Sequence, residues 1–276
     1  MAPRTWLITG CSSGFGRHLA EVVLERGDRL VATARRPETL DDLVARDPGR
    51  VLAVALDVTR PERLPAAVAA AHERFGAVDV LVNNAGFGSV GAVEELEAGH
   101  LREVMETMFF GPLALTQAVL PGMRARGRGA IVQISSMGGQ LSPPGFGAYC
   151  AAKFALEAAS ESLAAEVAPL GLRVVIVEPG SFRTGFAGGR LHRSPPLAAY
   201  AETVGPNREF LTAQDGSQEG DPRRAAEAIV SAVDAPQPPL RLALGADAVE
   251  AIRGSLQGRL AELESWEDVS RSTAFA

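Results

Sequence analysis

Short, almost uninterrupted apolar runs alternate along this chain with longer segments in which apolar positions recur every three or four residues. Runs such as Ile131-Val132-Gln133-Ile134 are typical of parallel strands that are covered on both faces. We predict strands over 5–9, 29–34, 51–55, 78–82, 129–134, 172–177 and 240–244. We predict helices over about 14–26, 38–46, 61–75, 98–126, 147–169, 222–234 and 247–268. This alternation predicts an α/β fold: a doubly wound parallel sheet (Rossmann fold) of about seven strands with helices on both faces.

The chain shows neither an internal repeat nor a linker, so we expect a single domain over residues 1–276. One segment interrupts the alternation, because residues 185–221 are rich in glycine, proline, serine and charge. This segment follows the sixth strand and would lie at the carboxyl edge of the sheet, where ligands bind. We interpret it as a substrate lid, and the alternative is a disordered surface insert. Its candidate apolar lining is Leu191, Leu197, Tyr200 and Phe210.

A helical extension is expected over residues 246–276 at the end of the chain. Leu256, Leu260, Leu263 and Trp266 recur there at helical spacing. We expect these side chains to pack on their own subunit. The alternative is that they form an interface between subunits.

Composition and charge narrow the class of protein. The 276 residues are 46% hydrophobic, enough for a large core, and the net charge of −6 gives no basic field for nucleic acid. Cys11 and Cys150 cannot form a disulfide framework and are expected to be small fillers in a reducing compartment. No apolar run approaches the roughly 20 residues that span a bilayer, and Met1-Ala2-Pro3-Arg4 leads directly into the first strand. We therefore expect a soluble, cytoplasmic protein without a nucleic-acid or membrane partner.

A glycine-rich turn follows the first predicted strand. Gly10-Cys11-Ser12-Ser13-Gly14-Phe15-Gly16 connects this strand to the first predicted helix. Glycines let the backbone approach a pyrophosphate, and the start of a helix offers free N–H groups and the positive end of its dipole. The order of strand, glycine turn and helix therefore predicts a phosphate-binding site.

Tyr149 and Lys153 lie four residues apart in a predicted helix, and Ser136 lies thirteen residues before the tyrosine. Residues at this spacing share a helix face, so the ammonium group would lie near the phenol and lower its pKa from about 10. Such a phenol can exchange a proton with a carbonyl/alcohol pair, and the Ser136 hydroxyl can hold the same oxygen. The alternative for the tyrosine and lysine is a solvated helix face.

Five motifs together resemble those of the short-chain dehydrogenase/reductase family. They are, in order, Thr9-Gly10-x-x-x-Gly14-x-Gly16, Asn83-Asn84-Ala85-Gly86, Ser136, Tyr149-x-x-x-Lys153 and Pro179-Gly180. The resemblance runs from about residue 4 to residue 185. Beyond that point a looser resemblance in composition is to the branch that includes retinol and 17β-hydroxysteroid dehydrogenase-like proteins.

The resemblance implies a nicotinamide cofactor and the residues that hold it. Asp57 and Val58 would contact the adenine, Asn83 would be partly structural, and Thr184 would hold the carboxamide, with a helix cap as its alternative role. The implied set is Gly10, Ser12, Ser13, Gly14, Phe15, Gly16, Asp57, Val58, Asn84, Ala85, Gly86, Tyr149, Lys153, Pro179, Gly180, Phe182 and Thr184.

Two arginines indicate which nicotinamide cofactor binds. A chain that binds NAD places Asp or Glu after the second strand, where it bonds the ribose 2′-hydroxyl. Here Ala34 is followed by Arg35 and Arg36 instead. A guanidinium group binds a 2′-phosphate well, so we expect NADP(H). The alternative is that the arginines only begin a solvated helix.

The reaction that the resemblance implies moves hydride between the nicotinamide and a carbonyl carbon while Tyr149 exchanges a proton with the oxygen. Ser136 would orient that oxygen, and Lys153 would bond the ribose and lower the tyrosine pKa. The family's fourth residue is an asparagine three residues before a glycine, and Met108 stands at this position before Gly111. The methionine keeps the backbone carbonyl but loses the amide hydrogen bonds. It indicates either a tolerated variant with slower proton exchange, or an altered or non-redox reaction, or an engineered substitution.

These observations predict an NADP(H)-dependent oxidoreductase that interconverts a ketone or aldehyde and an alcohol. The substrate is expected to be a bulky hydrophobic small molecule and the protein a homodimer or homotetramer. The alternatives are a non-redox enzyme, such as an isomerase or cyclase, that retains NADP(H), and a non-catalytic NADP-binding protein. Four histidines lack metal-ligand spacing, so no metal is expected; His18, His72 and His100 are assigned to surface or core, whereas His192 can reach a substrate from the lid.

Overall fold

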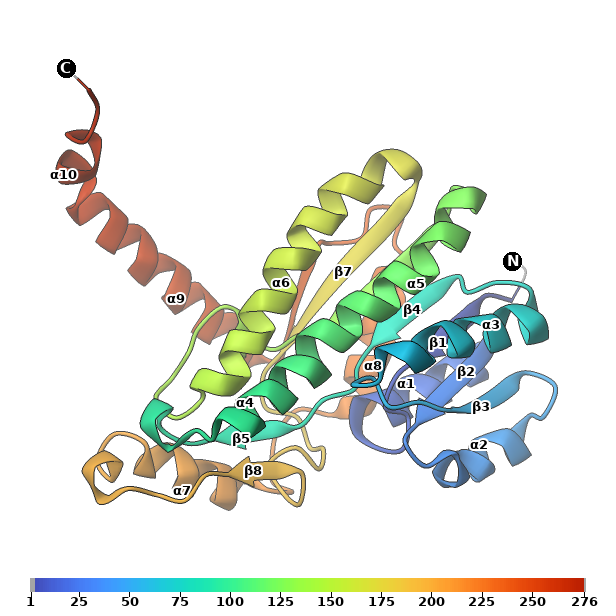
Figure 1. Cartoon of the computed structure of the whole chain (residues 1–276), viewed down its shortest axis with the longest axis horizontal. Helices are drawn as coiled ribbons and strands as arrows, with labels where there is room; N and C mark the ends of the chain where they lie inside the picture. The colour runs from blue at the N-terminus through green and yellow to red at the C-terminus, as the bar shows by residue number, and fades with distance from the viewer. Residues whose placement is uncertain (1–2, 276) are drawn as a thin grey trace.

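A seven-stranded parallel sheet forms the centre of the molecule. The computed structural model describes residues 3–275, and the strand order is β3-β2-β1-β4-β6-β7-β9 with every neighbouring pair parallel (Figure 1). The strands are β1 (Thr5–Ile8), β2 (Arg29–Ala34), β3 (Val51–Ala55), β4 (Val80–Asn83), β6 (Gly129–Ile134), β7 (Leu172–Pro179) and β9 (Arg241–Leu244). All seven predicted strands are confirmed, with ends shifted by up to two residues.

The order of the strands places a crevice beside β1 and β4. The chain adds β2 and β3 on one side of β1, then crosses to β4 on the other side and continues outwards. Ligands bind at such a reversal, outside the carboxyl ends of the strands. Because Ile8 pairs in register with Val82, the segments that follow these two residues leave the sheet next to each other.

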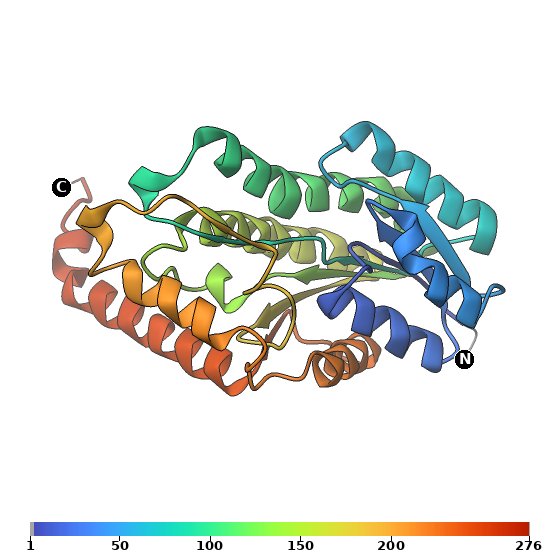
Figure 2. The same ribbon diagram turned by 90° about the horizontal axis from the view of Figure 1, so that it is seen from below.

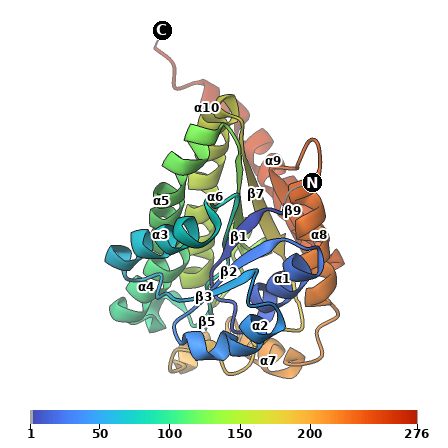
Figure 3. The same ribbon diagram turned by 90° about the vertical axis from the view of Figure 1, so that its right-hand side faces the viewer.

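Helices cover both faces of the sheet, as the edge-on view shows (Figure 3). On one face, α1 (Gly14–Glu25), α2 (Asp41–Arg46) and α8 (Pro222–Asp234) bury one apolar core. On the other face, α3 (Leu64–Phe75), α5 (Gly111–Arg126) and α6 (Gly147–Val167) bury a second core. Alternate side chains of β1 serve the two cores, since Trp6 and Ile8 lie in the first and Leu7 in the second. Among the described helices none has the length and apolarity to cross a membrane.

The helix predicted over 98–126 is interrupted. The structure has α4 (Ala98–Met105), one π-helical turn (Glu106–Phe110) and then α5. The Gly111 N–H donates to the Glu106 carbonyl, five residues back. A Cβ on Gly111 would lie 2.5 Å from the Val58 carbonyl oxygen, so the bend depends on the glycine. Single π turns of this kind are frequent at functional sites.

The segment 185–221 is folded rather than a disordered insert. It contains β8 (Leu191–Arg193) and α7 (Gly205–Gln214), and β8 pairs in parallel with a short strand that was not predicted, β5 (Gly88–Val90). These elements lie below the main sheet in Figure 1 and in front of it in Figure 2. Pairing with β5 therefore fixes this segment over the carboxyl edge.

The C-terminal helices leave the body of the protein. α9 (Ala246–Ser265) and α10 (Glu267–Arg271) extend away from the sheet (Figure 1). Ser255 Oγ donates to the Gln140 carbonyl oxygen at 3.0 Å, but every described residue from 256 onward is exposed. The expectation that the apolar side chains pack on their own subunit is wrong, because beyond Ser255 the helix contacts the body through Arg259, which donates to the Gln140 carbonyl oxygen at 2.6 Å, and leaves its apolar side chains exposed. The exposed fractions are Leu256 52%, Leu260 55%, Leu263 64% and Trp266 61%.

Candidate functional site

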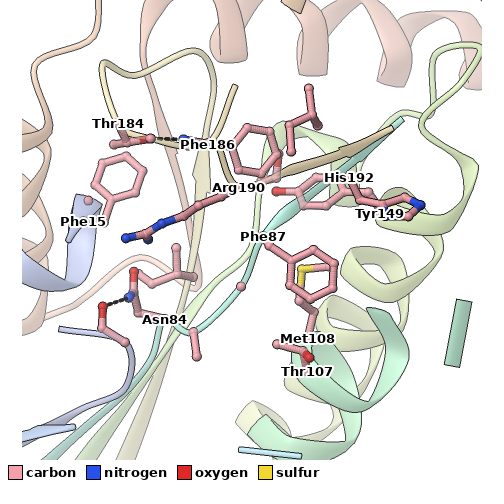
Figure 4. Close-up of a pocket in the computed structure, with 18 of the residues that line it drawn as sticks. Phe15, Asn84, Phe87, Thr107, Met108, Tyr149, Thr184, Phe186, Arg190 and His192 are labelled. Atoms are coloured by element: carbon pink, nitrogen blue, oxygen red, sulfur yellow. Dashed lines mark hydrogen bonds between the residues drawn. The ribbon is translucent and has the colours of Figure 1, made fainter. Parts of the chain in front are cut away.

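A pocket of about 1210 Å³ opens at the carboxyl ends of the central strands. This exceeds the ~300–1,000 Å³ typical of a single small-ligand site and suits a dinucleotide together with a second molecule. All the predicted cofactor and catalytic residues except Gly16 line it. Phe15, Asn84, Met108, Tyr149 and Thr184 are seen around it in Figure 4. Tertiary structure thus brings together residues that lie far apart in the sequence.

The glycine turn is held against the end of β4. Asn84 Nδ2 donates to the Thr9 carbonyl oxygen at 2.8 Å and to the Gly10 carbonyl oxygen at 3.3 Å. Gly10 and Gly14 have positive φ angles of 73° and 59°, which only glycine adopts without strain. The turn therefore presents its backbone to the pocket in a fixed conformation.

Gly16 allows α1 to pack closely against the glycine turn and is not part of the pocket lining. A Cβ at this position would lie 2.5 Å from both Asn84 Nδ2 and the Gly10 carbonyl oxygen. Gly16 is buried and does not line the pocket, and its contact with the cofactor stays a prediction. Its role is to let α1 approach the turn closely.

The start of α1 fits a phosphate group. The first turn of this helix carries no acidic side chain. Among the described residues, the Ser13 Oγ is buried without a hydrogen-bond partner. Free N–H groups, a helix dipole and an unpaired hydroxyl at one point suit the pyrophosphate of a dinucleotide.

One end of the pocket is cationic. Arg35, Arg36 and Arg60 all line it, beside Thr39. Asp57 also lines the pocket, and it accepts hydrogen bonds from the Thr59 N–H and hydroxyl at 3.0 and 2.8 Å. Arg60 was not predicted from the sequence. Its signal was its place three residues after Asp57, in the turn that follows β3.

Ser136, Tyr149 and Lys153 converge at the middle of the pocket. Ser136 Oγ accepts a hydrogen bond from the Gly138 N–H at 3.0 Å, which fixes the hydroxyl. Lys153 Nζ donates to the Ile134 carbonyl oxygen at 2.8 Å and lies 5.6 Å from the centre of the Tyr149 ring. The ammonium group therefore lies near the Tyr149 ring and is held in place by a backbone carbonyl.

Burial has the largest effect on the pKa values of Tyr149 and Lys153. Burial raises the pKa of Tyr149 well above its usual range, and the Ser136 hydroxyl acts in the opposite direction. Burial lowers the pKa of Lys153 to about 8, opposed by the charge of Glu157. The sequence predicted a lowered tyrosine pKa; the structure differs because the desolvation of a buried phenol outweighs the effect of its neighbours. The phenol consequently keeps its proton throughout the neutral range.

A buried acidic cluster lies one helical turn beyond Lys153. Glu157 accepts hydrogen bonds from Ser135 and Gln140, and Arg241 of β9 forms ion pairs with both Glu157 and Glu178. Burial and the proximity of Glu157 raise the pKa of Glu178. Arg241 thus neutralises carboxylates that would otherwise lie unpaired next to the segment that carries Ser136.

Met108 lies in the π turn and forms part of the pocket wall. Its side chain is buried with Val104 and Tyr149, and its sulfur would lie 3.3 Å from a Cβ on Gly86. Thioether and glycine therefore pack closely. The π turn is present although the asparagine of the family is not.

Aromatic groups line the other end of the pocket. Phe186 contacts Tyr149 edge-on with ring centres 5.3 Å apart. His100 stacks on His192 at 3.5 Å, and its Nε2 lies 2.9 Å from Ser89 Oγ. His192 was predicted to reach this region, whereas the contribution of His100 was missed, because it depends on the approach of β8 to α4.

The predicted apolar lining of the segment 185–221 is only half right. Leu191 and Phe210 line the pocket, but Leu197 and Tyr200 do not. Tyr200 instead donates a hydrogen bond to Glu94 on the outer surface. Arg190, which was not predicted, extends into the pocket between Phe15 and Asn84 (Figure 4).

The remaining candidates are inert. Cys11 and Cys150 are buried and unpaired, and burial raises the pKa of their thiols to about 12 and about 11, respectively. Both remain protonated, as expected of small fillers. Within residues 3–275, no group of His, Cys, Asp or Glu could hold a metal ion.

Comparison with known proteins defines the family. Residues 4–193 match the short chain dehydrogenase family, and the chain therefore belongs to the short-chain dehydrogenase/reductase family of oxidoreductases. The structure is similar to a short-chain dehydrogenase from Streptomyces avermitilis, with a TM-score of 0.94, 53% identity and 99% of each chain covered. The sequence is 38% identical to Oxidoreductase BOA17 of Botryotinia fuckeliana over 98% of this chain and 99% of that one. It is also 38% identical to human retinol dehydrogenase 8, over 87% and 81% of the two chains.

Two structural neighbours contain nucleotides. A short chain dehydrogenase from Burkholderia cenocepacia is in complex with NADP (TM-score 0.75, 27% identity, 95% and 97% of the chains covered). One from Burkholderia phymatum is in complex with NAD (TM-score 0.82, 25% identity, 95% of each chain covered). The fold of this family thus accommodates either nucleotide.

The titration of Lys153 can be measured directly, because it is the only lysine in the sequence. In protein labelled with ¹³C-lysine, the side-chain signal should titrate at a pH of about 8. Glu157→Gln removes the charge that favours the ammonium form and should move the midpoint lower. Glu161→Gln, one turn further along α6, is the control and should change it little. A midpoint near the ordinary value of about 10.4 would contradict the effect of burial.

Proposed function

We propose that this protein is an NADP(H)-dependent oxidoreductase that interconverts a carbonyl compound and an alcohol. The observation that carries the proposal is the convergence of Ser136, Tyr149 and Lys153 in one pocket, next to a glycine turn suited to a pyrophosphate. The proposed substrate is a bulky hydrophobic molecule that lies between the tyrosine and the segment 185–221, which acts as a lid.

The chain's own residues supply the proton and position the substrate. The bound nicotinamide supplies hydride chemistry. Tyr149 gives its phenolic proton to the substrate oxygen, and the fixed Ser136 hydroxyl holds that oxygen. The Lys153 ammonium, protonated below a pH of about 8, bonds the ribose and supports proton resupply. Because burial keeps the tyrosine protonated, the site is suited to reduction of the carbonyl at neutral pH.

The cationic end of the pocket supports NADP(H) over NAD(H). Arg35, Arg36 and Arg60 line this end of the pocket, and their positive charges support binding of a 2′-phosphate here. No carboxylate follows β2, so a free 2′-hydroxyl would lack its usual acceptor. Planar guanidinium groups bind phosphate through two parallel hydrogen bonds, which favours the phosphorylated cofactor.

The other end of the pocket supports a hydrophobic substrate. Phe87, Phe186, Leu191 and Phe210 provide apolar surface there, and the stacked histidines provide a polar edge. The similarity to retinol dehydrogenase 8 agrees with this substrate class. Buried, unpaired cysteines support a reducing compartment such as the cytoplasm.

One observation favours a second candidate function. Met108 replaces the asparagine of the family, and this supports a non-redox isomerase or cyclase that retains NADP(H). Tyr149 and Lys153 are both present, and they favour the oxidoreductase over a non-catalytic nucleotide-binding protein. The predictions below distinguish these functions.

Replacing Tyr149 by Phe removes the proposed proton donor but keeps the ring that packs against Phe186. Turnover of NADPH with a panel of hydrophobic ketones should fall about 100-fold or more, the scale of a general acid, while NADPH affinity is retained. Tyr200→Phe, which alters the only other tyrosine, is the control and should leave turnover unchanged. Full activity of Tyr149→Phe would exclude the proposed proton transfer.

Replacing Arg35 by Ala should change cofactor preference. Loss of a charge-assisted contact to phosphate costs about 1.5–3 kcal/mol, so NADPH affinity should fall about 10- to 100-fold. NADH affinity should remain almost the same, as fluorescence titration with both cofactors can show. Arg63→Ala, an exposed arginine outside the pocket, is the matched control. An equal loss for both cofactors would mean that Arg35 does not bind the 2′-phosphate.

Replacing Met108 by Asn tests whether the methionine only slows proton exchange. The amide restores the missing hydrogen-bonding groups, so turnover should rise about tenfold, with the largest gain where proton resupply limits the rate. Met108→Leu keeps an apolar side chain and should show no gain. A fall in turnover of Met108→Asn would show that the thioether is part of this protein's own site and would favour the non-redox function.

We also propose that the protein is a homodimer or homotetramer and that α9 contributes to its interface. A helix that exposes leucines along one side gains stability by burying them against a second copy. Replacing Leu260 and Leu263 by Glu should therefore halve the mass in solution, as measured by light scattering. Glu262→Lys, on the opposite side of the helix from Leu260, is the control. An unchanged mass of the double variant would exclude α9 from the interface.

A further inference from the structure

Arg190 differs from the nearest arginines on either side of it in the sequence. Arg183 donates to the Gln218 carbonyl oxygen at 3.0 and 3.2 Å, and Arg193 donates to the Ala187 carbonyl oxygen at 3.3 Å. Among the described residues, Arg190 forms neither an ion pair nor a side-chain hydrogen bond. Its guanidinium group instead extends from the lid across the pocket (Figure 4). A guanidinium group that reaches into the pocket without a partner is available to bind an anionic ligand.

The groups opposite Arg190 are those that suit an anion. In the view of Figure 4 its guanidinium projects between Phe15, in the first turn of α1, and Asn84, which holds the glycine turn, and all three residues line the pocket. The unpaired Ser13 Oγ and the N–H groups at the start of α1 belong to the same turn. An anion here would be bound by backbone donors on one side and by a guanidinium group on the other.

We propose that Arg190 binds the pyrophosphate of the dinucleotide and thereby couples cofactor binding to the stability of the lid in its position over the substrate. This inference rests on the proposed function, which supplies the dinucleotide. The glycine turn binds one side of the pyrophosphate, and Arg190 binds the side that faces the lid. Arg35 acts at a different place, on the 2′-phosphate at the other end of the nucleotide.

The coupling follows from what else the segment carries. Phe186, four residues before Arg190, packs edge-on against Tyr149. His192, two residues after it, stacks on His100, and β8 begins at Leu191. An ionic contact between Arg190 and the pyrophosphate therefore also fixes its two neighbours in the lid. These are Phe186, which covers the substrate oxygen beside Tyr149, and His192, which lines the substrate end of the pocket. The cofactor binds first, and the substrate site is completed around it.

Binding of nucleotide fragments tests this role without any turnover. Calorimetry should show that Arg190→Ala lowers NADP⁺ affinity about 10- to 100-fold, the range of a charge-assisted contact to phosphate. Affinity for adenosine 2′-monophosphate, which lacks the pyrophosphate, should change less than about twofold by the same reasoning, because no contact is lost. Arg35→Ala should weaken both ligands. Arg193→Ala, which removes a charge from the same segment but not from the pocket, is the matched control.

Hydrogen exchange tests the coupling itself. In the parent protein, NADP⁺ should protect the backbone amides of residues 185–193 and 88–90 from exchange. In Arg190→Ala, saturation with NADP⁺ should protect the glycine turn but no longer these two segments. A purely structural role of Arg190 would change exchange without the cofactor as well, which this comparison detects.

Three outcomes would overturn the inference. The first is an unchanged NADP⁺ affinity in Arg190→Ala, and the second is equal protection of the lid in the variant and the parent. The third is an increase only in the KM for the carbonyl substrate, which would assign Arg190 to a substrate anion. If the parent binds NAD⁺ in preference to NADP⁺, the proposed cofactor is wrong, but the same measurements with NAD⁺ still test Arg190, because the pyrophosphate is common to both.

Discussion

The close contact between the glycine turn and Asn84 is the constraint on which the site depends. The Asn84 amide donates to the Thr9 and Gly10 carbonyl oxygens, and the Thr9 hydroxyl accepts hydrogen bonds from the Asn84 and Ala85 N–H groups at 2.8 and 2.9 Å. These bonds connect the segment that follows β1 to the segment that follows β4, and the strand order reverses between these two strands. Because Gly16 has no side chain, α1 can enter the same contact and direct its N–H groups at the pocket. The shape of the proposed phosphate site and the position of Met108 beside Gly86 both follow from this arrangement.

The sequence correctly predicted those parts of the structure that are specified by residues close together in the chain. Apolar runs defined all seven strands of the sheet, and the glycine turn correctly located the start of α1. The π turn was missed, because it depends on the approach of Gly111 to the Val58 carbonyl rather than on helical periodicity. The pairing of β5 with β8 was missed for the same reason, since three-residue strands gain their stability from a partner distant in sequence.

The candidate site was predicted in its residue types but only partly in its physical chemistry. The spacing of Tyr149 and Lys153 indicated a neighbouring charge, yet it gave no measure of desolvation, which controls the pKa of both groups. Arg60 and Arg190 reach the pocket from loops whose direction no local pattern specifies. The exposed position of Leu260 was not predicted either. The helical periodicity of its apolar neighbours predicts a face that packs against something, but it does not indicate whether the same chain or another chain covers that face.

The ion pairs of Arg241 also constrain how the protein is synthesised. The buried Glu157 and Glu178 precede their partner in the chain, since Arg241 lies in β9, the last strand of the sheet. A growing polypeptide on the ribosome contains both carboxylates before it contains the guanidinium group, and burying them unpaired is strongly unfavourable. We therefore expect the helix that carries Tyr149 and Lys153 to reach its final packing only after residue 241 has left the exit tunnel, so that the candidate site is completed at the end of translation.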